Sequence, residues 1–350
     1  MQFDLFYEIS QPSHLARSEA QAYADTLAEI ELGDSLGFGC AWLVEHHFMR
    51  GYSHSSKPDL VLAAASQRTR RIRLGLSVVP LPYHHPVHVA ERAATLDILT
   101  GGRLELGIGR GFSPHEYGVF GAAMSDSRSI TAESLAILRA SFLRHPVTFH
   151  GEHYALDALD ILPYPLQSPH PPLWTAAVSP DTFIWAAQQQ LGMLAGPFKP
   201  WLMVKHDIGN YLDSAATVPA PRAGMTIGIF CMPDGKRARE LAKPALTWFY
   251  NALFSTTLPV LEKLYPSYEH FHDLGRFRSL IKLGINLKLL ETFGMAVVGT
   301  PAECIEKLQK YREAGVTNLL CAVGAGALPT EAIQESMRCI AEDVMPAFQA

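Results

Sequence analysis

The sequence lacks the features that mark membrane, secreted and nucleic-acid-binding proteins. It has no run of about 18 consecutive apolar residues, so we expect no membrane span. The opening MQFDLFYEIS lacks the basic region and the long apolar core of a signal peptide. The 29 basic residues are outnumbered by 34 acidic ones, which argues against a nucleic-acid-binding surface. We therefore expect a cytoplasmic protein with neither membrane nor nucleic acid among its partners.

Cysteine is also scarce, and its spacing argues against two kinds of site. The five cysteines form no CxxC pair, and their number is odd. Without a secretory signal, such cysteines are expected to be reduced thiols of a cytosolic protein rather than a disulfide framework. A structural zinc site is not expected, because such sites usually draw on closely spaced cysteine and histidine ligands.

What the sequence does contain is a regular alternation of apolar strands and amphipathic helices. Strands are expected at 2–9, 40–46, 72–81, 103–111, 171–178, 191–196, 222–232 and 317–325. A helix is expected between successive strands, as in 19–36, which stops at Gly37. Residues 147–157 are expected to form a small hairpin that turns at Gly151 and Glu152.

Eight strand–helix units predict parallel strands, right-handed crossovers and a single (β/α)₈ TIM barrel over residues 1–350. A dinucleotide-binding fold is the weaker alternative, because LELGIGRGF lies in mid-chain and lacks the full GxGxxG spacing. The rhythm is lost from about 255 to 294, which predicts an insertion between the seventh and eighth strands.

Polar side chains gather where the predicted strands end, and in such barrels chemistry belongs at that rim. The second strand ends in WLVEHHF, with Glu45, His46 and His47 in succession. Adjacent strand residues point to opposite sides, so the two histidines are not expected to bind one metal ion. The spacing also differs from HExxH, which places two imidazoles on one helix face. We predict no metal site here and keep an acid/base role and a structural role open.

A second group of strand-end residues predicts an anion site. Ser179 is a candidate N-cap, followed by Pro180 at the first helical position and Thr182 at the third. A helix N-terminus with free amides and two hydroxyls suits a phosphate. Arg110, between two glycines at the end of the fourth strand, can reach the same rim, and its guanidinium suits bidentate phosphate binding.

Several stretches together resemble the bacterial luciferase family, with the closest likeness to the alkanal monooxygenase branch and its relatives in secondary metabolism. They are WLVEHHF, LPYHHPVHVAERAATLDILTGGRLELGIGRGF, VFG at 119–121, VGTPAECIEKLQ and DVMP. The resemblance implies a (β/α)₈ barrel and a two-component enzyme that receives reduced FMN from a separate flavin reductase. It further implies that O₂ adds to the flavin, giving a hydroperoxide that oxidises a small organic or carrier-bound metabolite, and that the protein is a homodimer or a heterodimer.

The resemblance also assigns site residues. The catalytic imidazole of the family matches His46, with Glu45 and His47 orienting it or shaping the pocket. Its phosphate-binding arginine falls on Arg110. Its phosphate-binding hydroxyls fall on Ser179 and Thr182, and a non-proline cis peptide under the flavin ring falls on Ser77 and Val78.

Two departures from the family pattern bear on function. Gly109 stands where luciferases carry a reactive cysteine, so the pocket is expected to gain space there, and Val178 replaces a carboxylate. Both leave flavin binding in place but put light emission and aldehyde specificity in doubt. The segment 255–294 matches a lid that shields the reaction from water, or a helix packed on the barrel wall. A deazaflavin-dependent oxidoreductase and a non-catalytic flavin-binding homologue are the alternative functions.

Overall fold

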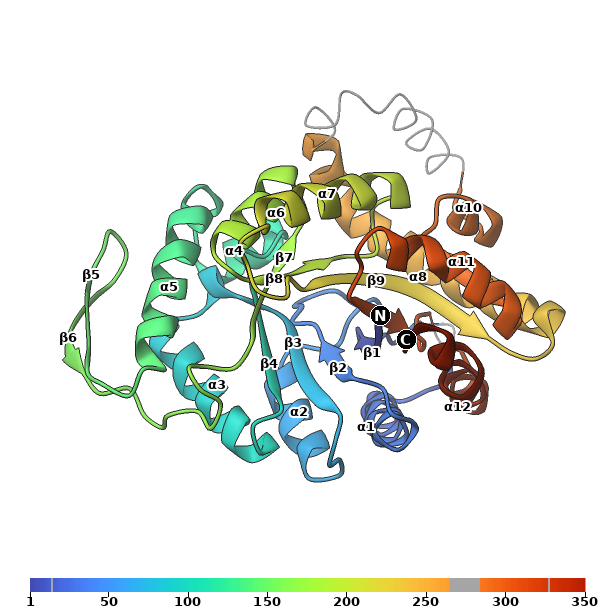
Figure 1. The fold of residues 1–350 in the computed structure, drawn as a ribbon, viewed down its shortest axis with the longest axis horizontal. Helices are drawn as coiled ribbons and strands as arrows, with labels where there is room; N and C mark the ends of the chain where they lie inside the picture. Colours follow the sequence, from blue (N-terminus) through green and yellow to red (C-terminus); the bar gives the residue numbers. More distant parts are fainter. Residues whose placement is uncertain (14, 265–283, 327, 350) are drawn as a thin grey trace.

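The computed structural model describes residues 1–13, 15–264, 284–326 and 328–349. Eight parallel strands form the centre of the molecule (Figure 1). They are β1 (Gln2–Tyr7), β2 (Cys40–Leu43), β3 (Arg73–Pro80), β4 (Leu104–Gly109), β7 (Leu173–Ala177), β8 (Gly192–Ala195), β9 (Ala223–Cys231) and β11 (Asn318–Ala322). The pairing of β8 with β9, where Met193 lies opposite Ala223, closes the ring. The predicted (β/α)₈ barrel is therefore confirmed.

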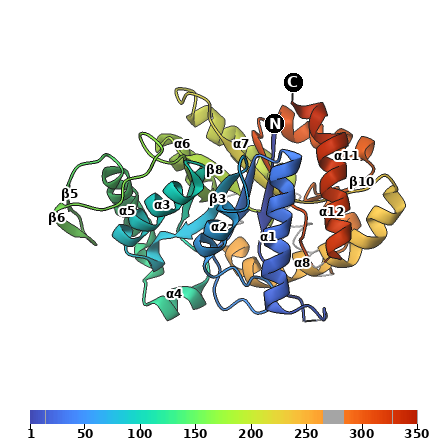
Figure 2. The same cartoon turned by 90° about the horizontal axis from the view of Figure 1, so that it is seen from below.

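Helices surround the barrel, as Figures 1 and 2 show from two sides. They are α1 (Glu19–Leu36), α2 (Pro58–Ser66), α3 (Pro86–Thr100), α5 (Ser127–Ser141), α6 (Pro180–Gln188), α7 (Trp201–Ser214), α8 (Gly235–Leu264), α11 (Pro301–Glu313) and α12 (Thr330–Cys339). Helix α1 illustrates why they stop where they do: Gly37 has φ 85° and its amide donates to Gly33 O, which confirms the predicted end. Within the described part of the chain, no helix combines the length and the apolar character needed to cross a membrane.

The predicted hairpin is present as β5 (Val147–His150) and β6 (Ala155–Leu159), which lie outside the barrel in Figure 1. Its turn closes through a bond from the Gly151 amide to Tyr154 O. The Glu133 carboxylate of α5 accepts the amides of residues 152, 153 and 154. Side chains that could bind a metal ion lie close together here, those of Glu133, Glu152 and His153. The hydrogen bonds of Glu133 to the turn explain this cluster structurally.

Three short elements were not predicted from the sequence. They are α4 (Pro114–Phe120), α10 (Leu287–Thr292) and β10 (Ala296–Gly299). Strand β10 pairs with the second half of β9, from Gly228 to Cys231. The expected loss of regular structure from residue 255 is wrong at its start, because α8 continues to Leu264. Residues 265–283 of the proposed lid lie outside the described residues, so the lid stays a prediction.

The N-terminal end of the barrel holds a layer of buried polar side chains. Asp4 of β1 is fully buried. Its Oδ1 accepts from Gln2 Nε2 at 2.8 Å, and its Oδ2 accepts from Trp42 Nε1 and Asn318 Nδ2, each at 3.0 Å. Burial raises the pKa of Asp4 to about 6, although these bonds oppose the shift.

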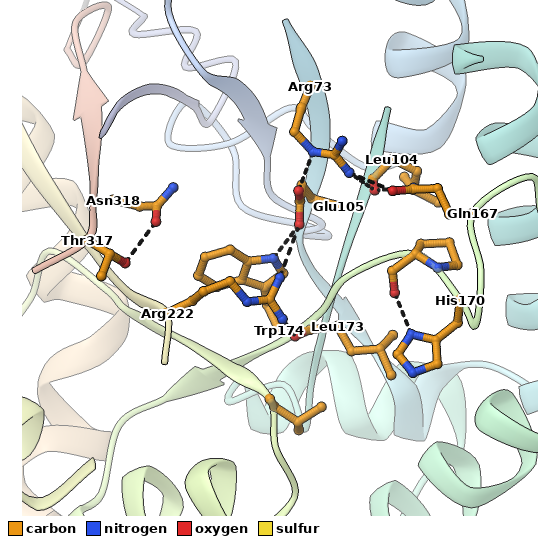
Figure 3. Close-up of polar contacts among 12 residues, drawn as sticks. Arg73, Leu104, Glu105, Gln167, His170, Leu173, Trp174, Arg222, Thr317 and Asn318 are labelled. Atoms are coloured by element: carbon orange, nitrogen blue, oxygen red, sulfur yellow. Dashed lines mark hydrogen bonds and ion pairs between the residues drawn. The ribbon is translucent and has the colours of Figure 1, made fainter. Parts of the chain in front are cut away.

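Glu105 of β4 stands in the same layer, drawn in Figure 3. Its Oε1 accepts from Arg73 Nε, and its Oε2 accepts from Trp174 Nε1 at 2.6 Å and lies 3.7 Å from Arg222 Nη1. The Arg222 guanidinium also lies over the Trp174 ring, 4.5 Å from its centroid. Both oxygens of each carboxyl group in this layer are thus paired, which suits a structural role.

Candidate active site

A cavity opens at the C-terminal ends of the strands, where the sequence predicted the site. Seven of the ten predicted site residues line it: Glu45, His46, Ser77, Val78, Arg110, Val178 and Thr182. Ser179 joins them through a 2.9 Å contact between its Oγ and Thr182 Oγ1. His47 and Gly109 do not line the cavity wall. Residues in or just after the C-terminal parts of four different strands are therefore brought together at one place, as a barrel requires.

His46 lies between two carboxyl groups in this cavity. Its Nε2 is 3.9 Å from Glu8 Oε2, and its Nδ1 is 3.9 Å from Glu116 Oε1. These distances are too long for hydrogen bonds but close enough for proton exchange after a small movement. Burial lowers the pKa of His46 to about 4, although the charge of Glu45 opposes the shift. The imidazole is therefore neutral at physiological pH and able to accept a proton.

Glu45 and His47 contact one another rather than His46. Glu45 Oε1 accepts from His47 Nε2 at 3.1 Å and from His84 Nε2 at 2.5 Å. Burial alone would raise the pKa of Glu45, but these two bonds outweigh it and lower the pKa to about 2. Glu45 is thus a fixed carboxylate held by two imidazoles. Its contacts fit shaping of the pocket, and no bond to His46 is present among the described residues.

Two carboxyl groups of the site were missed by the sequence reasoning. Glu116 is buried in α4, where its Oε1 accepts the His47 amide at 2.8 Å and its Oε2 accepts the Tyr83 hydroxyl at 3.1 Å. Because α4 was not predicted, Glu116 gave no signal. Glu8 directly follows β1, so the strand-end rule that singled out His46 applied to it as well.

The residues predicted to bind an anion lie at the start of α6 and in the cavity beside it. Ser179 is the N-cap and Pro180 the first helical residue, and the Ser179 hydroxyl bonds to Thr182 instead of capping an amide. Arg110 is half-buried, and its guanidinium has no hydrogen bond or ion pair with any residue that the structure describes. Burial and the nearby Arg128 lower the pKa of Arg110, so an anion beside it would be favourable. A cation without a partner and a helix N-terminus can together hold a phosphate.

The peptide bond between Ser77 and Val78 is cis, as the resemblance implied. The expectation of extra space at Gly109 is wrong, because the Val78 side chain fills it. A Cβ on Gly109 would lie 2.5 Å from Val78 Cγ2, and one on Gly107 would lie 3.0 Å from Val78 Cγ1. The two glycines of β4 therefore accommodate Val78, and the lost thiol leaves no gap.

A buried ion pair supports the segment before Ser179. Lys199 is fully buried and paired with Asp207, and its Nζ donates to Val178 O at 2.8 Å. Val178 itself presents its apolar side chain to the cavity. The sequence carried no signal for this pair, because its two residues come from the loop after β8 and from α7.

Comparison with known proteins shows which family this chain is similar to. Residues 1–318 match the family model described as luciferase-like monooxygenase. The chain is 42% identical to 4-hydroxyprotoasukamycin monooxygenase of Streptomyces nodosus subsp. asukaensis over 333 residues, which cover 90% of this chain and 84% of that protein. It is 26% identical to the alkanal monooxygenase alpha chain of the Kryptophanaron alfredi symbiont, with 99% and 98% covered.

Solved structures show the same fold. The monooxygenase RslO1 from Streptomyces bottropensis superposes with a TM-score of 0.84 at 27% identity, covering 99% of this chain and 100% of its own. The FMN complex of the oxygenating constituent of 3,6-diketocamphane monooxygenase from Pseudomonas putida has a TM-score of 0.79 at 20% identity, covering 99% and 98%. Coenzyme F420-dependent tetrahydromethanopterin reductase from Methanopyrus kandleri gives 0.71 at 18%, covering 99% of each chain.

The family model spans most of the chain, and a relative at 42% identity covers nine-tenths of it. The last two structures lie below 25% identity and show the fold alone. The chain belongs to the luciferase-like monooxygenase family.

Proposed function

We propose that this protein is the oxygenase component of a two-component monooxygenase that uses reduced FMN and O₂. Its substrate is a small organic or carrier-bound metabolite of secondary metabolism. The family membership and the 42% identical relative, whose name describes it as a monooxygenase, support this proposal. A separate flavin reductase is the proposed source of the reduced FMN.

The observation that carries the choice of cofactor is the Arg110 guanidinium. It is half-buried without a partner among the described residues, and it lines the same cavity as Thr182 at the α6 N-terminus. The phosphate of FMN fits this pair of groups, because each supplies hydrogen-bond donors to an anion. When bound, reduced FMN supplies the electrons that activate O₂. The Ser77–Val78 segment and Val178 line the same cavity.

The side chains around His46, in the same cavity, suit proton handling. His46 is neutral at physiological pH and half-buried, so it can take a proton from a substrate or deliver one. Phe112 packs edge-on against it at 5.5 Å and limits the directions in which the ring can move. Phe6, Leu194 and Phe198 add apolar surface to the cavity, which favours an organic substrate and excludes water.

The proposal is tested by anaerobic equilibrium titration with reduced FMN and, separately, with reduced coenzyme F420. Tight binding of reduced FMN, weakened in Arg110→Ala, supports the proposal. Tight binding of F420 without binding of reduced FMN would establish the deazaflavin-dependent alternative instead.

A second measurement separates an oxygenase from a flavin-storage protein. The protein loaded with reduced FMN is mixed with ¹⁸O₂ and candidate substrates, and products are analysed by mass spectrometry. One ¹⁸O atom per product molecule is expected. If bound reduced FMN reoxidises at the rate of free flavin and no substrate gains oxygen, the chain is a non-catalytic flavin-binding homologue.

A further inference from the structure

We propose that Glu8 is a second acid/base residue of this cavity and that its carboxyl group shares one proton with the His46 imidazole. The use of that proton in substrate oxidation rests on the proposed function. The sharing itself is a property of the protein without cofactor, so it can be tested separately.

The two oxygens of the Glu8 carboxyl group have different surroundings. Oε1 accepts a hydrogen bond from the Tyr52 hydroxyl at 2.8 Å. Oε2 is buried and has no hydrogen-bond partner among the described residues. Glu8 lines the cavity, and this free oxygen lies 3.9 Å from His46 Nε2. A buried carboxyl oxygen without a partner is rare in a structural site, so it calls for a ligand or a shared proton.

The groups around the pair determine where its proton resides. Burial raises the pKa of Glu8 to about 7 despite the bond from Tyr52. Burial lowers the pKa of His46 to about 4, against the opposing charge of Glu45. Between about pH 4 and pH 7 the pair therefore holds one proton, which lies on the carboxyl group, and the imidazole is neutral.

Other titratable groups face the pair from neighbouring elements. Glu116 of α4 lies 3.9 Å from His46 Nδ1, on the side away from Glu8. Arg17 and Glu29 share a smaller pocket with Glu8. Helix α8 presents uncharged side chains to the cavity, Leu253 and Thr257. Among the described residues, Glu8 is thus the acid nearest to His46 Nε2, whereas Glu116 keeps both oxygens bonded to His47 and Tyr83.

The proton can move within the pair without changing its total charge. In one state Glu8 Oε2 carries the proton and both groups are neutral. In the other, the Oε2–H bond breaks, an Nε2–H bond forms, and a carboxylate faces an imidazolium. A shift of about 1 Å brings the two atoms within hydrogen-bond range, since such bonds span about 2.7 to 3.2 Å. A substrate in the cavity thereby meets a neutral base and a neutral acid side by side.

The test is an NMR titration of the cofactor-free protein labelled with ¹⁵N-histidine. The His46 signals, identified by their loss in His46→Asn, are followed from pH 4 to pH 9. We expect a step at about pH 7, which reports Glu8, and a second step near the acid limit. Glu8→Gln should remove the first step, whereas the matched control Glu31→Gln, on an exposed face of α1, should keep both. A wild-type His46 without the step, or a Glu8→Gln variant that keeps it, would overturn the proposal.

A second variant covers the case in which Glu8→Gln does not fold. Tyr52→Phe removes the hydrogen bond that stabilises the carboxylate, so the step should move to higher pH. An unmoved midpoint would contradict the shared proton. Failure to bind reduced FMN would overturn the proposed function and leave this titration unaffected. Absence of the step in the wild type, together with normal FMN binding, would overturn only the role of Glu8.

Discussion

The buried carboxyl groups at the two ends of the barrel differ in how many hydrogen-bond partners they have. We call the N-terminal end, with its layer of paired polar side chains, the closed end, and the C-terminal end, where the cavity lies, the open end. Asp4 lies within β1, and Glu8 directly follows the strand, four residues further along the chain. At the closed end, both Asp4 oxygens accept hydrogen bonds from Gln2, Trp42 and Asn318. At the open end, one Glu8 oxygen is bonded and the other is not bonded to any described residue.

The arginine side chains differ between the two ends in the same way. The guanidinium groups of Arg73 and Arg222, at the closed end, both form ion pairs with Glu105. The guanidinium of Arg110, at the open end, has no hydrogen bond or ion pair with a described residue. Paired polar groups stabilise and fix the barrel, while unpaired ones retain their capacity for a ligand. Burial alone does not distinguish a structural polar group from one that can bind a ligand. The two are distinguished by the number of hydrogen-bonding positions that remain without a partner.

The largest expected effect is on the rate of substrate oxidation, and it comes from removing an acid/base group at the open end without disturbing the barrel. His46→Ala should lower the rate of substrate oxidation by about 10²-fold or more, because a positioned acid/base group is lost. Binding of reduced FMN and the free energy of unfolding should change little. Single-turnover rates measure the first effect and anaerobic titration the second; turnover equal to the wild type would remove His46 from the mechanism. His88→Ala, on the exposed start of α3, is the matched control.

The next largest effect is a loss of stability when the polar layer at the closed end is disrupted. Asp4→Leu leaves the Trp42 and Asn318 donors unpaired, so we expect a loss of about 2 kcal/mol in the free energy of unfolding. Glu8→Leu at the open end should cost less, because only the Tyr52 hydroxyl loses its partner. Denaturant unfolding at pH 7 measures both. Equal losses would contradict the division between the two ends.

Arg110→Ala tests the anion site. The loss of a charged hydrogen-bond donor should weaken binding of reduced FMN about tenfold or more, because such bonds contribute about 1.5–3 kcal/mol. Stability should be unchanged or slightly raised, since the guanidinium is half-buried without a described partner. The control is Arg70→Ala, whose side chain is exposed on the far side of the barrel from the cavity. The same Kd in Arg110→Ala and the wild type would show that Arg110 does not bind the phosphate.

Gly109→Ala sharpens the comparison by testing how tightly the open end is packed. The new Cβ would press on Val78 Cγ2, which should cost about 1 kcal/mol. Adding Val78→Ala should recover part of this loss, and a double-mutant cycle of unfolding free energies gives the coupling. Additive effects would mean that the two residues do not share this space. Gly118→Ala, where a Cβ meets no atom within 4 Å, controls for the loss of a glycine.

The last comparison concerns the pH dependence of stability. The folded-state pKa of Glu8 is raised to about 7 from the usual 4.5, so its contribution is present below about pH 4.5 and is lost as the pH rises through 7. Between pH 5 and pH 8, Glu8→Gln should therefore gain about 2 to 3 kcal/mol of stability relative to the wild type, because only the wild type carries the shifted carboxyl group. Parallel unfolding curves at the two pH values measure this. A constant difference across the range would mean that Glu8 titrates normally.

Local patterns explain how much of this structure could be predicted from the sequence. The alternation of strands and helices and the N-cap at Ser179 depend on neighbouring residues, so the barrel and the start of α6 were predicted. Strand β10 is only four residues long and lies after the region where the pattern was lost. Helix α4 has seven residues, including Gly118, and Glu116 was missed with it.

The remaining differences between the predictions and the structure arise from contacts between segments that are distant in the sequence. The space at Gly109 was misjudged because Val78 lies 31 positions earlier in the chain and fills it from β3. The pairing of Glu45 with His84 depends on a loop after β3 that no short motif describes. Glu8 differs from these, since it follows β1 as His46 follows β2 and could have been found by the same rule.

The even spacing of Asp4, in β1, and Glu8, directly after β1, has a genetic consequence. Side chains alternate along a strand, so an insertion or deletion of one codon between them would shift the register by one residue. One carboxyl group would then point to the opposite face, while the other would stay in place. Substitutions can alter either end of the barrel alone, but a frame-preserving change in length within these few codons must disrupt either the scaffold or the chemistry. The first strand is therefore a segment in which natural variation should occur by replacement of residues and not by changes in length.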